Sequence, residues 1–364
     1  MADPFNDIVG PATTDLDTAL LQTASPVFDR LRREAEMIDA KGVQAEHVAT
    51  LGALGVLSAG VDQTRAATAR EVHEQLAAAS ASAWFVCAQH RSAAVAAEGT
   101  DNTELRARWS EALNSGRSLG AVSKAHIRRP GPPTVSAERA GSGWLLDGTL
   151  DWVTSWGLAD ALLLLAETDD AEIVQVVIPA EEREGLLVDG PLQLAAMMGT
   201  ATVGAHLVKM KAADTEVADV VSKTTWLEKD TARAANIQPA VYGIARAVIA
   251  ALHDIGVQRS FAEASDLAQQ LRSRLIANRH KAYHLIDNVD PQEEISARVS
   301  ARAEALHLLQ QANEALITAH GGRAMLLSSS AQRWARESLF MLIQAQTPDL
   351  RTELLRLVAT SVGK

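Results

Sequence analysis

Residues 143–168, GWLLDGTLDWVTSWGLADALLLLAET, carry the most informative pattern in this chain of 364 residues. Residues 144–146 and 149–154 are short runs rich in large apolar and β-branched side chains, which are typical of strands. Asp147-Gly148 lies between them, and such a pair predicts a two-residue hairpin turn. Residues 162–165 form a further apolar run bounded by acidic residues. The stretch therefore predicts a β region in the middle of the chain.

The predicted strands continue beyond this stretch, whereas both ends of the chain are helical in character. Residues 173–178, 186–188 and 203–208 are further strand candidates. Residues 1–115 are rich in alanine and leucine, which favour helices, and segments such as residues 72–97 are predicted to be packed helices. The order helices, strands, helices is unusual and limits the choice of fold.

Two apolar stripes with three- and four-residue spacing predict long helices in the last third of the chain. The first stripe is Val241, Ile244, Ala245, Val248, Ile249 and Leu252, and the second is Leu306, Leu309, Ala312 and Leu316. Gly256 and Gly321-Gly322 follow the stripes and are expected to end these helices, because glycine adopts the left-handed conformation without a steric penalty.

Composition excludes several classes of function. A net charge of −11 argues against broad binding to nucleic acids or anionic membranes, which would repel the chain. Cys87 is the single cysteine, so an internal disulfide or a cysteine-rich metal site is excluded. The histidines form no HExxH pair, and we expect no metal; P-loop and GxGxxG motifs are also absent. The start MADPFNDIVG is not typical of a signal peptide and we see no membrane-spanning run, so we expect a cytoplasmic protein.

Three segments resemble the acyl-CoA dehydrogenase superfamily in the right order: residues 143–168 its "W-[IV]-[TS]" motif, 186–219 its "MGxR" turn and 320–340 its "GGxG…R" run. The resemblance spans about residues 20–360. It implies an α+β, mainly α fold of three domains. These are an N-terminal helical domain (1–115), a middle β-barrel or sandwich domain (116–215) and a C-terminal four-helix bundle (216–364).

The resemblance further implies FAD between the β domain and the bundle of a homodimer or homotetramer. The family's flavin-contacting Trp and Thr correspond to Trp152 and Thr154, and Ser123 matches a hydroxyl residue that reaches the flavin. An indole supplies flat apolar area and a hydroxyl can bond a ring nitrogen. Lys124 stands where the family usually has Glu, and the Gly-Ser-Asp run after it is missing, which leaves the substrate class open.

The resemblance assigns a second set of residues to the rest of the cofactor site: Arg259, Phe261, Gln269, Gly321, Gly322 and Thr347. Arginine is a natural bidentate partner of phosphate oxygens. Arg259 stands one residue nearer to Phe261 than the family's arginine stands to its phenylalanine, and Ala262 replaces a glycine, so this match is partial.

The family's proton-abstracting glutamate is missing. Its usual position falls on Ala345, whose methyl group cannot accept a proton. The base position that some members use on an earlier helix falls near Ala232, beside Arg233. Glu228 and Asp230 could serve only if this register is shifted. No catalytic residue is therefore assigned.

Three hypotheses stay open. The first is an FAD-dependent oxidoreductase acting on an acyl-CoA or related carbonyl compound with a non-standard base. The second is a flavin-dependent monooxygenase, for which residues 79–90 match a helix but the expected histidine is replaced by Gln344 and Gln346, leaving His90 and His320 nearest to matched motifs. The third is a catalytically silent subunit that pairs with a related active chain.

Overall fold

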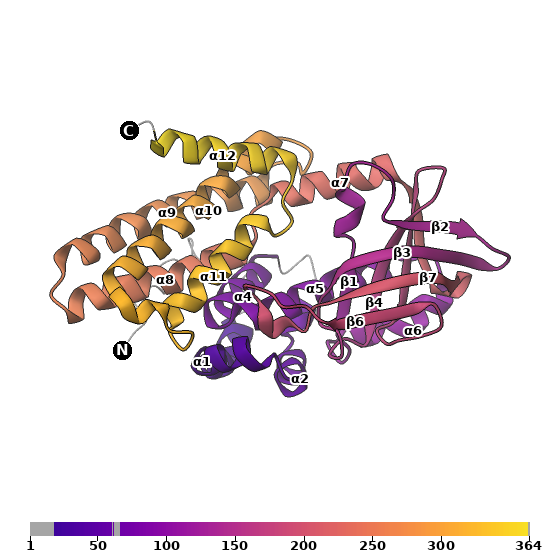
Figure 1. The fold of residues 1–364 in the computed structure, drawn as a ribbon, viewed down its shortest axis with the longest axis horizontal. Helices are drawn as coiled ribbons and strands as arrows, with labels where there is room; N and C mark the ends of the chain where they lie inside the picture. The colour runs from indigo at the N-terminus through magenta and orange to yellow at the C-terminus, as the bar shows by residue number, and fades with distance from the viewer. Residues whose placement is uncertain (1–17, 60, 62–65, 363–364) are drawn as a thin grey trace.

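The computed structural model describes residues 18–59, 61 and 66–362 (Figure 1). The predicted absence of a signal peptide concerns residues 1–10, which lie outside the described part. The first helical region consists of α1 (Thr18–Lys41), α2 (Ala45–Ala53), α3 (Val56–Ala59), α4 (Ala66–Ala79), α5 (Ala81–Gly99) and α6 (Thr103–Asn114). Ser80 separates α4 from α5 because its side chain accepts a hydrogen bond from the Ala83 amide, at 3.3 Å, and so caps α5.

The strands form one eight-stranded sheet. They are β1 (Gly120–Ser123), β2 (Val135–Arg139), β3 (Gly143–Val153), β4 (Ala161–Glu167), β5 (Glu172–Pro179), β6 (Leu186–Pro191), β7 (Val203–Ala213) and β8 (Val217–Ser222). The order is β6-β7-β3-β2-β4-β5-β8, and β1 pairs with β4 in parallel. The fully buried pattern of β4 explains its continuous apolar sequence.

The predicted hairpin at Asp147-Gly148 is wrong. β3 runs straight through this pair, with β2 on one side and β7 on the other, and the register with β7 shifts between Leu146 and Gly148. Gly148 has φ +140°, and a Cβ there would lie 2.1 Å from the Thr134 carbonyl oxygen. The glycine therefore serves a bulge within a long strand, which short-range turn signals do not distinguish from a hairpin.

The second helical region consists of α7 (Lys223–Ala235), α8 (Pro239–Gln258), α9 (Ala262–Asn288), α10 (Ile295–His320), α11 (Ser330–Ile343) and α12 (Pro348–Val362). Gly321, with φ +76°, ends α10 as expected, whereas α8 continues two residues beyond Gly256. Figure 1 shows α8 to α12 packed at one end of the molecule, the sheet at the other, and α1 to α5 between them.

This architecture confirms the predicted α+β, mainly helical fold. Helices give way to strands at Gly120, and strands give way to helices after Ser222. We keep the division into three domains as a proposal.

Helix α8 forms the centre of the helical core, which it shares with α4, α9 and α10. By length and composition the stretch Lys223–Gln258 could cross a membrane, contrary to the sequence expectation; 61% of its most apolar window is buried inside the protein. Its apolar side chains are thus used in packing.

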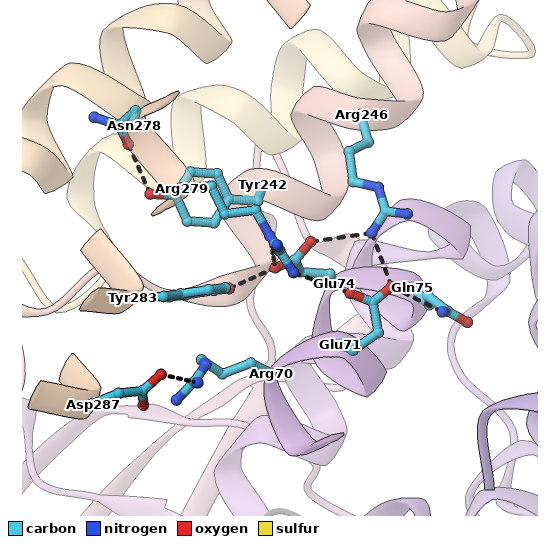
Figure 2. A network of polar contacts seen from close by, with 10 residues as sticks. All are labelled: Arg70, Glu71, Glu74, Gln75, Tyr242, Arg246, Asn278, Arg279, Tyr283 and Asp287. Atoms are coloured by element: carbon cyan, nitrogen blue, oxygen red, sulfur yellow. Dashed lines mark hydrogen bonds and ion pairs between the residues drawn. The ribbon is translucent and has the colours of Figure 1, made fainter. Parts of the chain in front are cut away.

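Buried charges join the two helical regions (Figure 2). Glu71 and Glu74 of α4 pair with Arg246 of α8 and Arg279 of α9, at distances between 2.7 and 3.1 Å. The Tyr283 hydroxyl donates to Glu74 Oε1 at 2.6 Å. All of these charged groups are at least nine-tenths buried, so the network fixes α4 relative to α8 and α9.

Candidate functional site

Three of the residues predicted to contact the flavin lie where β1 contacts β3. Ser123 ends β1 and is buried, and among the described residues its hydroxyl makes no hydrogen bond. Trp152 lies near the end of β3 with 48% of its surface exposed, and Thr154 follows β3 and is buried. A half-exposed indole beside buried hydroxyls is a surface on which a flat aromatic ligand could rest.

Hydrogen bonds that link three hydroxyl groups determine whether Thr154 can donate a hydrogen bond to a ligand or accept one from it. The Thr200 hydroxyl donates to the Met197 carbonyl at 2.7 Å, so it accepts from Thr202 Oγ1 at 2.8 Å. The Thr202 proton is then used, and Thr154 Oγ1 must donate to Thr202 Oγ1 at 3.2 Å. Thr154 consequently presents acceptor lone pairs to a ligand. To donate to a ring nitrogen it must give up its bond to Thr202.

The remaining cofactor candidates, except Thr347, lie at the far end of the bundle. Arg259 follows α8 and donates to the Ala319 and His320 carbonyls at 2.9 and 3.4 Å, so it lies beside the exposed Gly321 and Gly322. Phe261 directly precedes α9, Gln269 lies further along this helix, and both are exposed. We call these residues (Arg259, Phe261, Gln269, Gly321 and Gly322) the Arg259 group. The 20-residue α8 is about 30 Å long and separates the Arg259 group from the helix end nearer the sheet.

Ala345 lies in the turn between α11 and α12, with φ +48°. The Arg302 guanidinium of α10 donates to the carbonyls of Gln344 (2.6 Å), Ala345 (3.3 Å) and Ala234. The turn is therefore held against the end of α7. Thr347 directly precedes α12 and accepts a hydrogen bond from the Leu350 amide at 3.3 Å, which is a capping role.

Of the acidic alternatives, Asp230 is buried and Glu228 is exposed. Arg128 holds Asp230 with two hydrogen bonds, one of them 2.9 Å long, and Arg233 also pairs with it. Burial alone would raise the pKa of Asp230, but the two guanidiniums hold it below its usual value, so it is a weak proton acceptor. Glu228 and the buried Ala232 line an open hollow of about 370 Å³ that also includes Gln292 and Ile295.

Sequence reasoning missed the basic surroundings of Asp230. Lys124 follows β1, and its ammonium donates to Ser92 Oγ at 3.1 Å. Burial, and then the charge of Arg233, lower the pKa of Lys124 to about 7; Asp230 opposes this shift, and Arg128 and Arg91 add to it. A signal was available, because Lys124 replaces a residue that is usually acidic in the family.

The two candidate histidines differ in environment. His90 is buried, and its Nδ1 accepts from the Gly120 amide at 3.1 Å. Burial lowers the pKa of His90 to about 4, so it is neutral and structural. His320 ends α10, beside the Arg259 group. Within the described ranges no three His, Cys, Asp or Glu side chains are grouped to hold a metal ion.

Cys87 should be inert in the folded protein. It is buried in α5, and burial raises the pKa of its thiol to about 12. Because the thiolate is the reactive species, we expect no reaction with a disulfide reagent such as dithionitrobenzoate at pH 8, and one equivalent of reaction after unfolding in guanidinium. Rapid labelling of the native protein would contradict this assignment.

Comparison with solved structures identifies the fold. The chain is similar to butyryl-CoA dehydrogenase from Megasphaera elsdenii (TM-score 0.80, 16% identity, 98% of this chain and 100% of that chain). It is similar to glutaryl-CoA dehydrogenase from Mycobacterium smegmatis, solved with FADH2 (0.74, 18%, 96% of both chains). It is also similar to nitrososynthase from Micromonospora carbonacea (0.79, 18%, 98% of both chains).

No protein-family model matches the sequence, and no curated protein matches it. The structural neighbours nevertheless cover nearly the whole chain, which confirms the resemblance to the acyl-CoA dehydrogenase superfamily at the level of the fold. The identities, 18% or less in these three, are too low to transfer an activity.

Proposed function

We propose that this chain is an FAD-dependent oxidoreductase that acts on an acyl thioester or related carbonyl compound without a carboxylate base at position 345. The observation that carries the proposal is the half-exposed Trp152 beside the buried hydroxyls of Ser123 and Thr154. The neighbour solved with FADH2 shares this fold. When bound, FAD would supply the capacity to accept two electrons from the substrate.

The residues present fit the ring of a flavin better than its diphosphate. Trp152 offers apolar area, Thr154 offers lone pairs, and Ser123 offers a hydroxyl that makes no hydrogen bond within the described part of the chain. At the other end, a Cβ added to Gly321 or Gly322 would meet nothing within 4 Å, so these glycines form no closed cradle in the single chain.

A second copy of the chain would complete the site. The Arg259 group lies too far from Trp152 for both to act in one chain without a large rearrangement. Beside Gly322, Met325, Leu326 and Leu327 are 66, 57 and 70% exposed. Such an apolar strip on a free surface favours burial by another chain. We therefore include a homo-oligomer in the proposal.

The proposal is tested by FAD binding to purified protein and to two variants. Trp152→Ala should weaken FAD binding at least about tenfold, because it removes an aromatic contact worth roughly 0.5–1.5 kcal/mol beyond its apolar area. Trp144→Ala, the same change at the other end of β3, should bind like the wild type. Visible absorbance and fluorescence quenching on titration with FAD measure the affinity, and melting temperatures show whether each variant is folded.

The outcomes separate the hypotheses. A protein that binds no added FAD would contradict the proposal and favour the silent subunit. Bleaching of bound FAD by an acyl-CoA under anaerobic conditions would support a dehydrogenase. A hydroxylated product formed from reduced flavin and oxygen would instead support the monooxygenase. Equal FAD affinity of both tryptophan variants would show that the ring binds elsewhere.

A further inference from the structure

Five basic side chains from four parts of the chain converge between the sheet and the bundle. They are Arg91 of α5, Lys124 and Arg128 after β1, Arg233 of α7 and Arg302 of α10. Lys124 donates to Ser92 Oγ, next to Arg91; Arg128 and Arg233 share Asp230; and Arg302 donates to the carbonyl of Ala234, next to Arg233. In agreement with these contacts, beyond the effect of burial, Arg233, Arg128 and Arg91 lower the pKa of Lys124, and Arg128 lowers that of Arg302. We call these five residues the basic cluster.

The basic cluster has too little negative charge. Within the described part of the chain, its ion pairs all go to Asp230, through Arg128 and Arg233. Five cations against one carboxylate leave a net charge of +4, or +3 with Lys124 neutral. His73 of α4, which faces Arg91, has a pKa lowered to about 4 by burial and by that arginine, so it adds no charge.

Three members of the cluster lack any carboxylate partner in the described structure. Arg302 is 1% exposed, and within the described part of the chain it bonds only backbone carbonyls and leaves its Nε–H without an acceptor. Among residues 18–59, 61 and 66–362, Lys124 bonds only the Ser92 hydroxyl, and Arg91 makes no hydrogen bond or ion pair. Arg302 is buried, Arg91 and Lys124 are partly buried, and charges removed from water in proteins are normally paired. Unpaired cations gathered at one place therefore point to an anion from outside the chain.

The location connects this charge with the candidate site. Lys124 follows Ser123 in sequence, and Arg129, next to Arg128, pairs with Asp151 beside Trp152. Arg302 holds the carbonyl of Ala345, and Arg233 lies beside the alternative base position. Each of the two positions where the family carries an acidic base, here Ala345 and Ala232, thus lies beside a positively charged side chain.

We propose that the basic cluster is a binding site for the oxyanion of a small organic acid, a carboxylate or phosphate group, with Arg91 and Lys124 as its principal ligands. Guanidinium and ammonium groups bind such oxyanions through charge-assisted hydrogen bonds. One part of this inference rests on the proposed function, namely that the acid is the substrate of the flavin reaction. Binding of the anion itself does not require FAD.

Lys124 gives the site a measurable signature. An ammonium favours a bound anion and a neutral amine does not, so an oxyanion should raise the pKa of Lys124 from about 7. Binding at pH 8 should therefore take up a proton, and affinity should fall as the pH rises above 7.

The test titrates the full-length protein, without and with FAD, by calorimetry at constant ionic strength. Acetate and inorganic phosphate are the probes, and acetamide is the uncharged match for acetate. We expect millimolar binding of at least one anion and none of acetamide. Heats measured at pH 8 in two buffers with different ionisation enthalpies report the proton uptake. Tighter binding of acetate would identify a carboxylate, and tighter binding of phosphate a phosphate group.

Variants assign the ligands. Arg91→Met and Lys124→Met should each weaken binding by about tenfold or more, equivalent to 1.4 kcal/mol. Lys124→Met should also abolish the proton uptake. Arg117→Gln is the control, because it removes one positive charge from an exposed pair with Glu111 outside the cluster. Melting temperatures verify folding, and Arg91→Lys should partly restore binding.

The result would overturn the proposal if neither anion binds more tightly than acetamide, or if Arg117→Gln weakens binding as much as Arg91→Met. If the protein binds acetate with proton uptake but does not bind FAD, the proposed function is wrong and the anion site is supported. If the protein binds FAD but neither anion, the anion site is wrong and the proposed function is unaffected.

Discussion

Replacement of Arg279 by Met is expected to lower the free energy of unfolding by about 3–5 kcal/mol, because it leaves buried carboxylates with too little positive charge. In the folded protein Arg279 Nε donates to Glu74 at 2.7 Å and Nη2 to Glu71 at 3.1 Å (Figure 2). Methionine fills much of the same volume but neutralises neither acid. Urea denaturation measures the loss.

The pH dependence of this variant follows from Glu74. Burial already raises the pKa of Glu74, although Arg279 and Arg246 oppose the shift. Without Arg279 the pKa rises further. An acid whose pKa is higher in the folded state than in the unfolded state loses stability as the pH rises through the folded value. The deficit of Arg279→Met should therefore be larger at pH 8 than at pH 5.

Two controls isolate the buried network. Arg274→Met changes an exposed arginine on the same helix, which bonds Gln311, and should alter stability by less than about 0.5 kcal/mol. The double variant Arg279→Met/Glu74→Gln should recover part of the loss, since it removes one unpaired acid together with the base. If Arg279→Met and Arg274→Met are equally stable, the network does not hold the helices as described.

Replacement of Gly243 by Ala should cost about 2 kcal/mol, although alanine is the better helix former. A Cβ at Gly243 would lie 2.1 Å from the backbone oxygen of Glu74, so α4 and α8 must move apart. Overpacking of this kind costs about 1–3 kcal/mol, and the gain in helix propensity returns only about 1 kcal/mol. The contact is with backbone, which cannot rotate away, so we expect the upper end of the cost.

Gly99→Ala is the matched control for this prediction. Gly99 ends α5 with nothing within 4 Å of an added Cβ, so alanine there should be neutral or slightly stabilising. Thermal and urea denaturation of both variants give the comparison. A Gly243→Ala protein as stable as the wild type would show that the α4–α8 contact is looser than the structure describes.

Local patterns were sufficient for much of the fold. The alternating and continuous apolar runs predicted strands that the structure contains, including β4, and Gly321 ends α10 where its conformational freedom suggested. The same local logic failed at Gly148, because a glycine with positive φ serves a bulge as well as a turn. Only the strands on both sides of β3 decide between these two.

The candidate site, too, was predictable from the sequence only in part. Trp152 and Thr154 were selected from one short motif, but the acceptor role of Thr154 depends on Thr200 and Thr202, which are almost 50 residues away. The basic cluster joins residues from 91 to 302. No spacing rule relates Arg91 to Arg233, so the sequence analysis did not group these charges.

The sequence by itself determined the order of helices and strands, the missing acid at Ala345 and the presence of an indole at Trp152. Tertiary structure alone decided that Asp230 pairs with Arg128, that Arg302 is buried without a carboxylate partner among the described residues, and that Glu74 contacts two guanidiniums. The physical reason is range. Backbone propensity and side-chain periodicity act over a few residues, whereas burial and charge pairing depend on which distant segments pack together.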